Sequence, residues 1–198
     1  MTSNTSTSAD ITPLAITIGA TANDKMYDGN NVAVVHGLTP TGFITGDDIS
    51  FVPGAASFSD ANAAIGKQVT VNNIAGSGAD IGNYTWNTTA TTLATITPYI
   101  ITLHGTRQYD GSTTIAASAF ASDLKVDGIN GDTLTLSGAG SVGDKNVSNA
   151  KPLTAIGTLG LQGNGTALGS NYTLVGGAHD ATITPKQIVV DATGSNKV

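Results

Sequence analysis

The tripeptide Tyr-Asp-Gly occurs twice in the chain, as Tyr27-Asp28-Gly29 and as Tyr109-Asp110-Gly111. Its carboxylate could bind a cation or a sugar hydroxyl, and its ring could stack on a sugar. The same residues also suit a turn, in which Asp bonds its own backbone, Gly takes a positive φ and Tyr buries its ring. Each copy lies where a strand should reverse, so we favour a structural role. Tyr84 and Tyr172 form a second matching pair of structural tyrosines.

Three other aspartates, Asp47, Asp48 and Asp132, are the remaining candidates for a metal site. Calcium takes about six to eight oxygens, often from Asp at alternate positions of a Gly-containing loop, and the chain has no such loop. We therefore expect no cofactor, with calcium at a module junction as the alternative. No carboxylate pair has an acid/base partner at a recognisable spacing, so we expect no catalytic residue and no enzyme.

The remaining groups with chemical potential are histidines, lysines and one tryptophan. His36, His104 and His179 do not recur at matching positions, so we interpret them as ordinary strand or loop residues. Lys67 and Lys151 do recur, which leaves open a lysine crosslinked to an Asp or Asn side chain. Trp86 aligns with Leu174, and this exchange indicates core filling instead of sugar stacking.

Composition favours an all-β protein. Charged residues make up 11% of the 198 residues, Glu is absent, and Gly, Thr, Ser and Asn, which are weak helix formers, are abundant. The net charge of −6 offers no basic patch for a phosphate backbone, so we expect no nucleic-acid partner. No apolar run approaches about 18 residues, so we expect no membrane insertion.

The two Tyr-Asp-Gly copies belong to a tandem duplication of most of the chain. Repeat one contains "YDG" at Tyr27, "TGDDISF", "FSDANAAIGK", "GNYTW" and "ATITP" in that order, and repeat two contains "YDG" at Tyr109, "NGDTLTL", "VGDKNVSNAK", "SNYTL" and "ATITP". We expect a disordered segment at 1–10, modules at 11–98 and 99–185, and the start of a truncated third repeat at 186–198.

Alternating apolar residues within these landmarks predict strands. Ile16 and Ile18, Val69 and Val71, and Leu134 and Leu136 alternate with small or polar residues, and Gly/Asn clusters separate the runs as turns. Short strands with turns every 8 to 12 residues predict two tandem β-sandwich modules of immunoglobulin-like shape, with a β-grasp arrangement as the alternative. The stretch "SAFASDLK" is the best candidate for a single helical turn.

The tail that begins at Pro185 aligns without a gap on the stretch that begins at Pro13, and Ile188 falls on Ile16. We therefore expect the tail to be the first strand of a further repeat. Such a strand should be either frayed or added to a neighbouring sheet, whereas Ile16 and Ile18 should be fully integrated.

The ordered motifs "KxYDG", "GD" before a β run, "DxN…GK", "GNYT" and "ATITP" resemble the YDG-type, glycine-rich repeats of large bacterial surface adhesins of the filamentous-haemagglutinin kind. Repeat two departs from the pattern in lacking the lysine and having Gln108 before Tyr109. The resemblance implies a secreted or cell-surface protein concerned with adhesion and biofilm, and it transfers no catalytic residue. We expect a structural spacer whose partners are adjacent repeats; the alternative is that the modules themselves bind a host glycan or protein.

Overall fold

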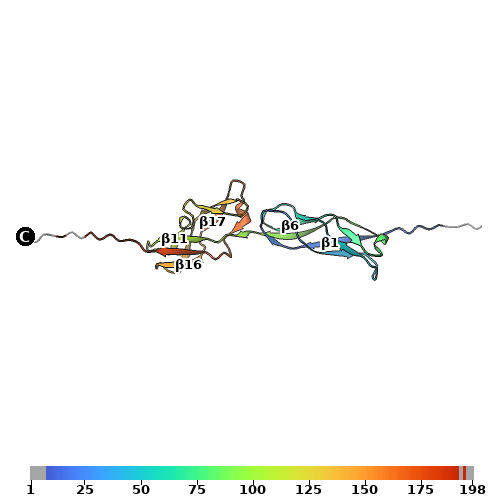
Figure 1. Ribbon diagram of the computed structural model, residues 1–198, viewed down its shortest axis with the longest axis horizontal. Helices are drawn as coiled ribbons and strands as arrows, with labels where there is room; N and C mark the ends of the chain where they lie inside the picture. The colour runs from blue at the N-terminus through green and yellow to red at the C-terminus, as the bar shows by residue number, and fades with distance from the viewer. Residues whose placement is uncertain (1–7, 192–193, 195–198) are drawn as a thin grey trace, which may run out of the picture. The chain divides into compact units, whose positions relative to one another are not determined.

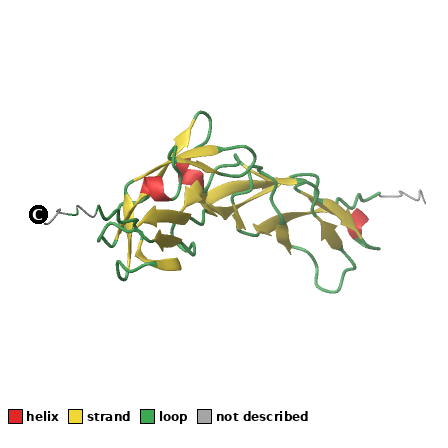
Figure 2. Cartoon of the chain, turned by 60° about the vertical axis from the view of Figure 1, so that its left-hand side comes forward, coloured by secondary structure: helices red, strands yellow, loops and turns green. Residues whose placement is uncertain are grey.

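The computed structural model describes residues 8–191 and residue 194, which form two compact units, Met1–Thr97 (module 1) and Pro98–Val198 (module 2). Figure 1 colours them from blue to green and from green to red. Most of the expected disordered segment 1–10, and residues 192–193 and 195–198 of the expected third repeat, lie outside the described residues. The chain is all-β, as predicted, and helix in the described part is confined to short 3-10 turns (Figure 2).

The described residues of module 1 contain nine strands arranged in small sheets. They are β1 (Leu14–Ala22), β2 (Lys25–Met26), β3 (Val35–Thr41), β4 (Ser50–Val52), β5 (Ala56–Phe58), β6 (Ala64–Val71), β7 (Ala75–Ser77), β8 (Tyr84–Trp86) and β9 (Ala90–Thr97), with the 3-10 turn η1 (Ile81–Asn83) before β8. The sheet orders are β3-β1-β8, β2-β9-β6-β5 and β4-β7.

Module 2 repeats much of this plan. Its strands are β10 (Tyr99–Ile100), β11 (His104–Gln108), β12 (Thr114–Ala116), β13 (Lys125–Asp127), β14 (Thr133–Ser137), β15 (Ala139–Val142), β16 (Ser148–Ala155), β17 (Gly160–Asn164), β18 (Tyr172–Thr173) and β19 (Asp180–Thr184), with the 3-10 turns η2 (Ala117–Ala119) and η3 (Gly169–Asn171). The sheet orders are β11-β19-β16-β15-β12, β13-β14-β17 and β10-β18.

The predicted alternation decides which side chains enter the core. On β1, Ile16 and Ile18 are 6% and 2% exposed and join a buried cluster with Val71, Ile74 and Tyr84. In module 2, Ile115, Val142, Ala181 and Ile183 form a buried cluster, and Leu134 and Leu136 on β14 are fully buried. A strand that buries one face in this way has its register fixed, because a slip by one residue would expose every apolar side chain.

In both modules, the first and last strands run parallel to each other. In module 1, β1 pairs with β8 from Leu14 to Ile16, and β2 pairs with β9. In module 2, β10 pairs with β18, and β11 pairs with β19 along its whole length. Because the pairing is parallel, the chain enters each module at one end of these strands and leaves it at the other end.

A bulge occurs at the same place in the two modules. The pairing of β6 with β9 shifts between Ala64 and Lys67, and the pairing of β16 with β19 shifts between Ser148 and Lys151. The residue just before each lysine has a positive φ, +63° at Gly66 and +44° at Ala150. A bulge re-aims the side chain that follows it, and here that side chain is a lysine.

The modules differ in what lies beside their first long strand, which is β1 in module 1 and β11 in module 2. In module 1, β3 pairs antiparallel with β1 from Thr17 to Ala22. In module 2, the stretch "SAFASDLK" instead contributes to η2, close to the helical turn expected there, and a β-carbon built at Gly105 on β11 would lie 2.7 Å from the ring of Phe120. In module 2, the Phe120 ring packed against Gly105 thus takes part of the place that β3 holds beside β1 in module 1.

The tail after Pro185 contains no strand in its described residues. Ile188, Val189 and Val190 are all more than 80% exposed, in contrast to the buried Ile16 and Ile18. The described tail therefore adds no strand to module 2, and the interpretation of this tail as a further repeat stays a prediction.

Candidate functional site

The clearest repeated arrangement joins a buried tyrosine to an aspartate in a Gly-Asp turn. In module 2, the Tyr172 hydroxyl donates to Oδ2 of Asp132 at 2.7 Å and accepts from the Ile129 backbone N–H at 3.2 Å. In module 1, Tyr84 donates to Oδ2 of Asp47 and accepts from the Ile44 N–H at 3.1 Å. We call this arrangement the tyrosine clasp.

The clasp depends on local turn geometry. The glycine before each aspartate has a positive φ, +105° at Gly46 and +83° at Gly131. A residue with a side chain would be strained in this backbone conformation. The hydrogen bond to Asp47 raises the pKa of Tyr84 above its ordinary value. Each tyrosine ties the end of η1 or η3 to a distant turn of the same module.

The Tyr-Asp-Gly motif itself forms a turn closed by a cation from the preceding strand. In module 1, Nζ of Lys25 donates to Oδ1 of Asp28 at 2.8 Å and to the carbonyl of Asn30 at 2.8 Å, while the Asn30 N–H donates to the same aspartate oxygen. Gly29 has a φ of +80°. Asp28 thus accepts a hydrogen bond within its own turn and forms an ion pair with Lys25.

Module 2 lacks the lysine, as its sequence shows, but it closes this turn with another cation. Gln108 precedes Tyr109, but the residue that corresponds to Lys25 is Arg107, whose guanidinium donates to Asp110 and to the carbonyl of Ser112. In both modules, a positively charged side chain two positions before the tyrosine closes the turn.

The tyrosine of each Tyr-Asp-Gly motif lies beside the last strand of its module. Tyr27 donates its backbone N–H to the carbonyl of Thr97, and Tyr109 donates to the carbonyl of Thr184, each at 2.8 Å. Tyr27 is 9% exposed, and Tyr109 is half-buried. Both extend the parallel pairing between the first and last strands.

The recurring lysines form ion pairs with the aspartate seven residues earlier. Nζ of Lys67 lies 2.6 Å from Oδ1 of Asp60, and Nζ of Lys151 lies 2.5 Å from Oδ1 of Asp144. The hydrogen bond from the lysine is the largest cause that lowers the pKa of each aspartate below its ordinary value. A crosslink would need a neutral amine and a protonated carboxyl, so this ion pair opposes the crosslinking alternative.

The three candidate metal ligands serve other contacts. Asp47 and Asp132 belong to separate clasps, and Oδ2 of Asp48 accepts from the Ala79 N–H at 3.1 Å, while Oδ2 of Asp80 accepts from the Asp48 N–H. Among the described residues, no group of three His, Cys, Asp or Glu side chains is placed to hold a metal ion.

The histidines also lie apart. His36 is exposed on β3, and Nδ1 of His104 lies 2.8 Å from Oδ2 of Asp180 at an exposed position. His179 is buried, where Nδ1 accepts from the Leu103 N–H at 3.1 Å and Nε2 lies 2.7 Å from the Leu174 carbonyl. The Asn87 side chain accepts from the Ile18 N–H of module 1 in the same way. His179 therefore fills a backbone-binding role.

The neighbours of Trp86 are seen only in the structure. Its ring meets Phe51 edge to face with centroids 5.4 Å apart, and its Nε1 donates to the Ile74 carbonyl. A β-carbon built at Gly76 would lie 2.9 Å from Trp86. The corresponding strand positions of module 2 carry Leu174 and Leu161, so the exchange of Trp for Leu is matched by an exchange of Gly for Leu.

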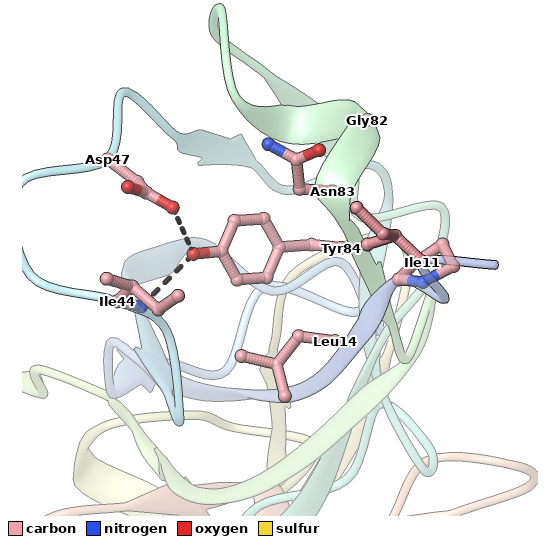
Figure 3. Close-up of a pocket in the computed structure, with 8 residues that line it drawn as sticks. Ile11, Leu14, Ile44, Asp47, Gly82, Asn83 and Tyr84 are labelled. Atoms are coloured by element: carbon pink, nitrogen blue, oxygen red, sulfur yellow. Dashed lines mark hydrogen bonds between the residues drawn. The ribbon is translucent and has the colours of Figure 1, made fainter. Parts of the chain in front are cut away.

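One feature of module 1 is a pocket of about 260 Å³ beside the tyrosine clasp (Figure 3). Its apolar lining includes Leu14 and Ile44, and Asp47 and Asn83 supply polar groups around the Tyr84 ring. In module 2, the position of Leu14 is held by Tyr99, whose ring meets Tyr172 edge to face at 6.2 Å. The sequence shows that Leu14, which follows Pro13, corresponds to Tyr99, which follows Pro98. It does not show how this exchange changes the pocket.

The comparisons with known proteins agree with the duplication. Residues 12–92 and residues 92–183 each match the family model described as the YDG domain. No curated protein and no solved structure matches the chain. In the described part of the chain, no helix is long and apolar enough to cross a membrane.

Proposed function

The chain belongs to the YDG domain family, and from this premise we propose that it is a non-enzymatic tandem-repeat segment of a secreted bacterial adhesin that acts as a stalk or spacer. Its partners are then adjacent repeats of a longer chain, at the bacterial cell surface. The proposal requires neither a cofactor nor a calcium ion, because side-chain ammonium and guanidinium groups already neutralise the aspartates of the repeated turns.

The observation that carries the proposal is the parallel pairing of the first and last strands within each module. In module 2, His104 to Gln108 of β11 pair in register with Asp180 to Thr184 of β19. Tension applied along the chain pulls the start of β11 and the end of β19 in opposite directions along the strand axis. All hydrogen bonds between them are then sheared together, whereas tension across the strands would break them one at a time.

The repeated polar residues support the same function. The tyrosine clasp, the cation that closes the Tyr-Asp-Gly turn and the lysine ion pair occur in both modules and join parts of the same module. Residues that are bonded to one another in both copies brace the fold. As for its detailed class, we propose the immunoglobulin-like β-sandwich, with β-grasp as the alternative.

Single-molecule force measurements on module 2 within the whole chain test the stalk proposal. The chain has no native cysteine, so handles can be placed by substitution. Thr102→Cys with Lys186→Cys loads β11 and β19 in shear, whereas Thr102→Cys with Ala178→Cys pulls the neighbouring starts of the two strands apart. We expect a several-fold higher unfolding force in shear, because forced unfolding reports the barrier to unfolding. Equal forces in the two geometries would contradict the proposal.

A second candidate function is that the modules themselves bind a glycan or a host protein. The pocket beside Tyr84 favours it, because its lining is not copied residue for residue in module 2.

A further inference from the structure

We propose that the pocket beside Tyr84 in module 1 binds an aromatic side chain, of the tyrosine type, from a partner protein. This inference goes beyond the stalk function and chooses one class of partner for the second candidate. The lining consists of Ile11, Pro13, Leu14, Ile44, Asp47, Gly82, Asn83 and Tyr84. Every lining residue belongs to module 1, so the site is complete within one module.

The volume suits a single ring. Apolar cavities of about 150 Å³ take up benzene, and this pocket measures about 260 Å³. Its rim is apolar and accessible, since Leu14 is 43% exposed and Ile44 is 60% exposed. An aromatic side chain seated there would remove these surfaces from water, and buried aromatic anchors dominate the binding energy of many protein interfaces.

Module 2 indicates which chemistry the site accepts. At the position of Leu14 it carries Tyr99, whose ring contacts Tyr172 at an interplanar angle of 74°. Edge-to-face contacts of this kind add about 0.5–1.5 kcal/mol to the effect of burial alone. Module 2 therefore presents its own aromatic ring to the clasp tyrosine, whereas in module 1 Leu14 holds that position and lines the pocket beside Tyr84.

Polar groups at the pocket suit a phenol on a basic peptide. Oδ2 of Asp47 accepts the Tyr84 hydroxyl, and Oδ1 accepts no hydrogen bond from the described part of the chain. The side-chain amide of Asn83 likewise makes none within the described residues. Oδ1 of Asp47 can therefore accept a hydrogen bond from a hydroxyl, and the Asn83 amide can donate to a hydroxyl or accept from it. Asp48 and Asp80 lie in the same pair of turns, and the pocket lining contains neither Lys nor Arg. This charge favours a tyrosine flanked by basic residues.

A heteronuclear NMR titration of the whole chain with the peptide acetyl-Lys-Tyr-Lys-amide tests the proposal. We expect shifts of the backbone amides of Ile44 and Asn83, and weaker shifts with acetyl-Glu-Tyr-Glu-amide. Acetyl-Lys-Ala-Lys-amide is the matched probe without a ring, and methyl β-glucoside tests a sugar as the occupant. Equal binding of the alanine peptide, tighter binding of the glucoside, or no shift at about 10 mM tyrosine peptide would each overturn the proposal.

Reciprocal variants test the site itself. Leu14→Tyr copies module 2 and should weaken binding at least about tenfold, whereas Tyr99→Leu should create a second site that shifts the amide of Ile129. Ile44→Ala changes only the exposed rim and serves if Leu14→Tyr fails to fold; it should also weaken binding. Unchanged affinity in the folded Leu14 and Ile44 variants would overturn the proposal. The force measurement on module 2 does not involve this pocket, so the two proposals can fail separately.

Discussion

The Tyr172 hydroxyl donates to Oδ2 of Asp132 at 2.7 Å, although the two residues are 40 positions apart in the chain. The same contact joins Tyr84 to Asp47 across 37 positions in module 1. A duplicated pair that meets over such separations acts as a tether between a 3-10 turn and a Gly-Asp turn. It gives the "GD" and "GNYT" motifs a shared physical role.

Removal of the clasp hydroxyl should destabilise only the module that carries it. Tyr84→Phe deletes a hydrogen bond to a charged group and leaves the Ile44 N–H without its acceptor, so we expect a loss of about 1.5–3 kcal/mol. Trp86 is the only tryptophan, so its fluorescence during urea unfolding reports module 1. Tyr172→Phe is the matched control and should leave the Trp86 transition unchanged. A Tyr84→Phe transition that coincides with the wild type would show that the clasp contributes nothing.

The Trp86 and Gly76 positions should be energetically coupled. Gly76→Leu forces a side chain into the space held by Trp86 and should destabilise module 1 by about 1–3 kcal/mol. Combined with Trp86→Leu, it reproduces the pair found in module 2, so the double variant should be more stable than the sum of the single effects by at least about 1 kcal/mol. The wild type, the two single variants and the double variant should be compared by circular dichroism during urea unfolding. Tryptophan fluorescence cannot be used for all four, because two of the variants lack Trp86. Additive effects would contradict the pairing.

His179 should be more important for stability than its isolated position in the sequence indicates. His179→Ala leaves the N–H of Leu103 without an acceptor in a buried place, so we expect module 2 to lose about 1–3 kcal/mol. Asn87→Ala is the counterpart in module 1, where it frees the N–H of Ile18. His36→Ala, at an exposed position, is the control and should have little effect. The unfolding transition followed by circular dichroism distinguishes these outcomes.

Acid should weaken both modules through the lysine ion pairs. The pKa values of Asp60 and Asp144 in the folded chain lie below the ordinary value of 3.8, chiefly because of Lys67 and Lys151. A carboxyl with a depressed folded pKa contributes stability above its unfolded pKa and loses it as the pH falls through the folded value. We therefore expect the melting temperature to decrease as the pH is lowered below about 4.

Aspartate variants separate this effect from general acid denaturation. Asp60→Asn with Asp144→Asn should lower the melting temperature at neutral pH and reduce its further decrease in acid, so that variant and wild type converge at the lowest pH. Asp127→Asn is the control, since Asp127 has no ion pair within the described residues. Parallel melting curves for the double variant and the wild type at every pH would contradict the assignment.

The duplication, the strand content and the turn positions could be predicted from sequence because their causes are local. Alternation at Ile16 and Ile18 predicts a strand with one buried face, and Asp28 followed by Gly29 predicts a turn, wherever the strand later pairs. The lack of α-helix in the described residues follows in the same way from the abundance of weak helix formers. Arg107 aligns with Lys25 in the sequence, two positions before the tyrosine, but only the structure shows that its guanidinium closes the Tyr-Asp-Gly turn of module 2.

Only the tertiary structure decided which distant groups meet. The sequence marked Asp47 and Asp132 as candidate ligands, but their contacts with Tyr84 and Tyr172 depend on how the sheets bring far parts of the chain together. The parallel pairing of first and last strands depends equally on topology, since alternation along one strand does not specify its neighbour. The sequence shows the exchange of Leu14 for Tyr99, but only the structure shows that Leu14 lines a pocket and that Tyr99 packs against Tyr172, because the space around a side chain is set by all its neighbours.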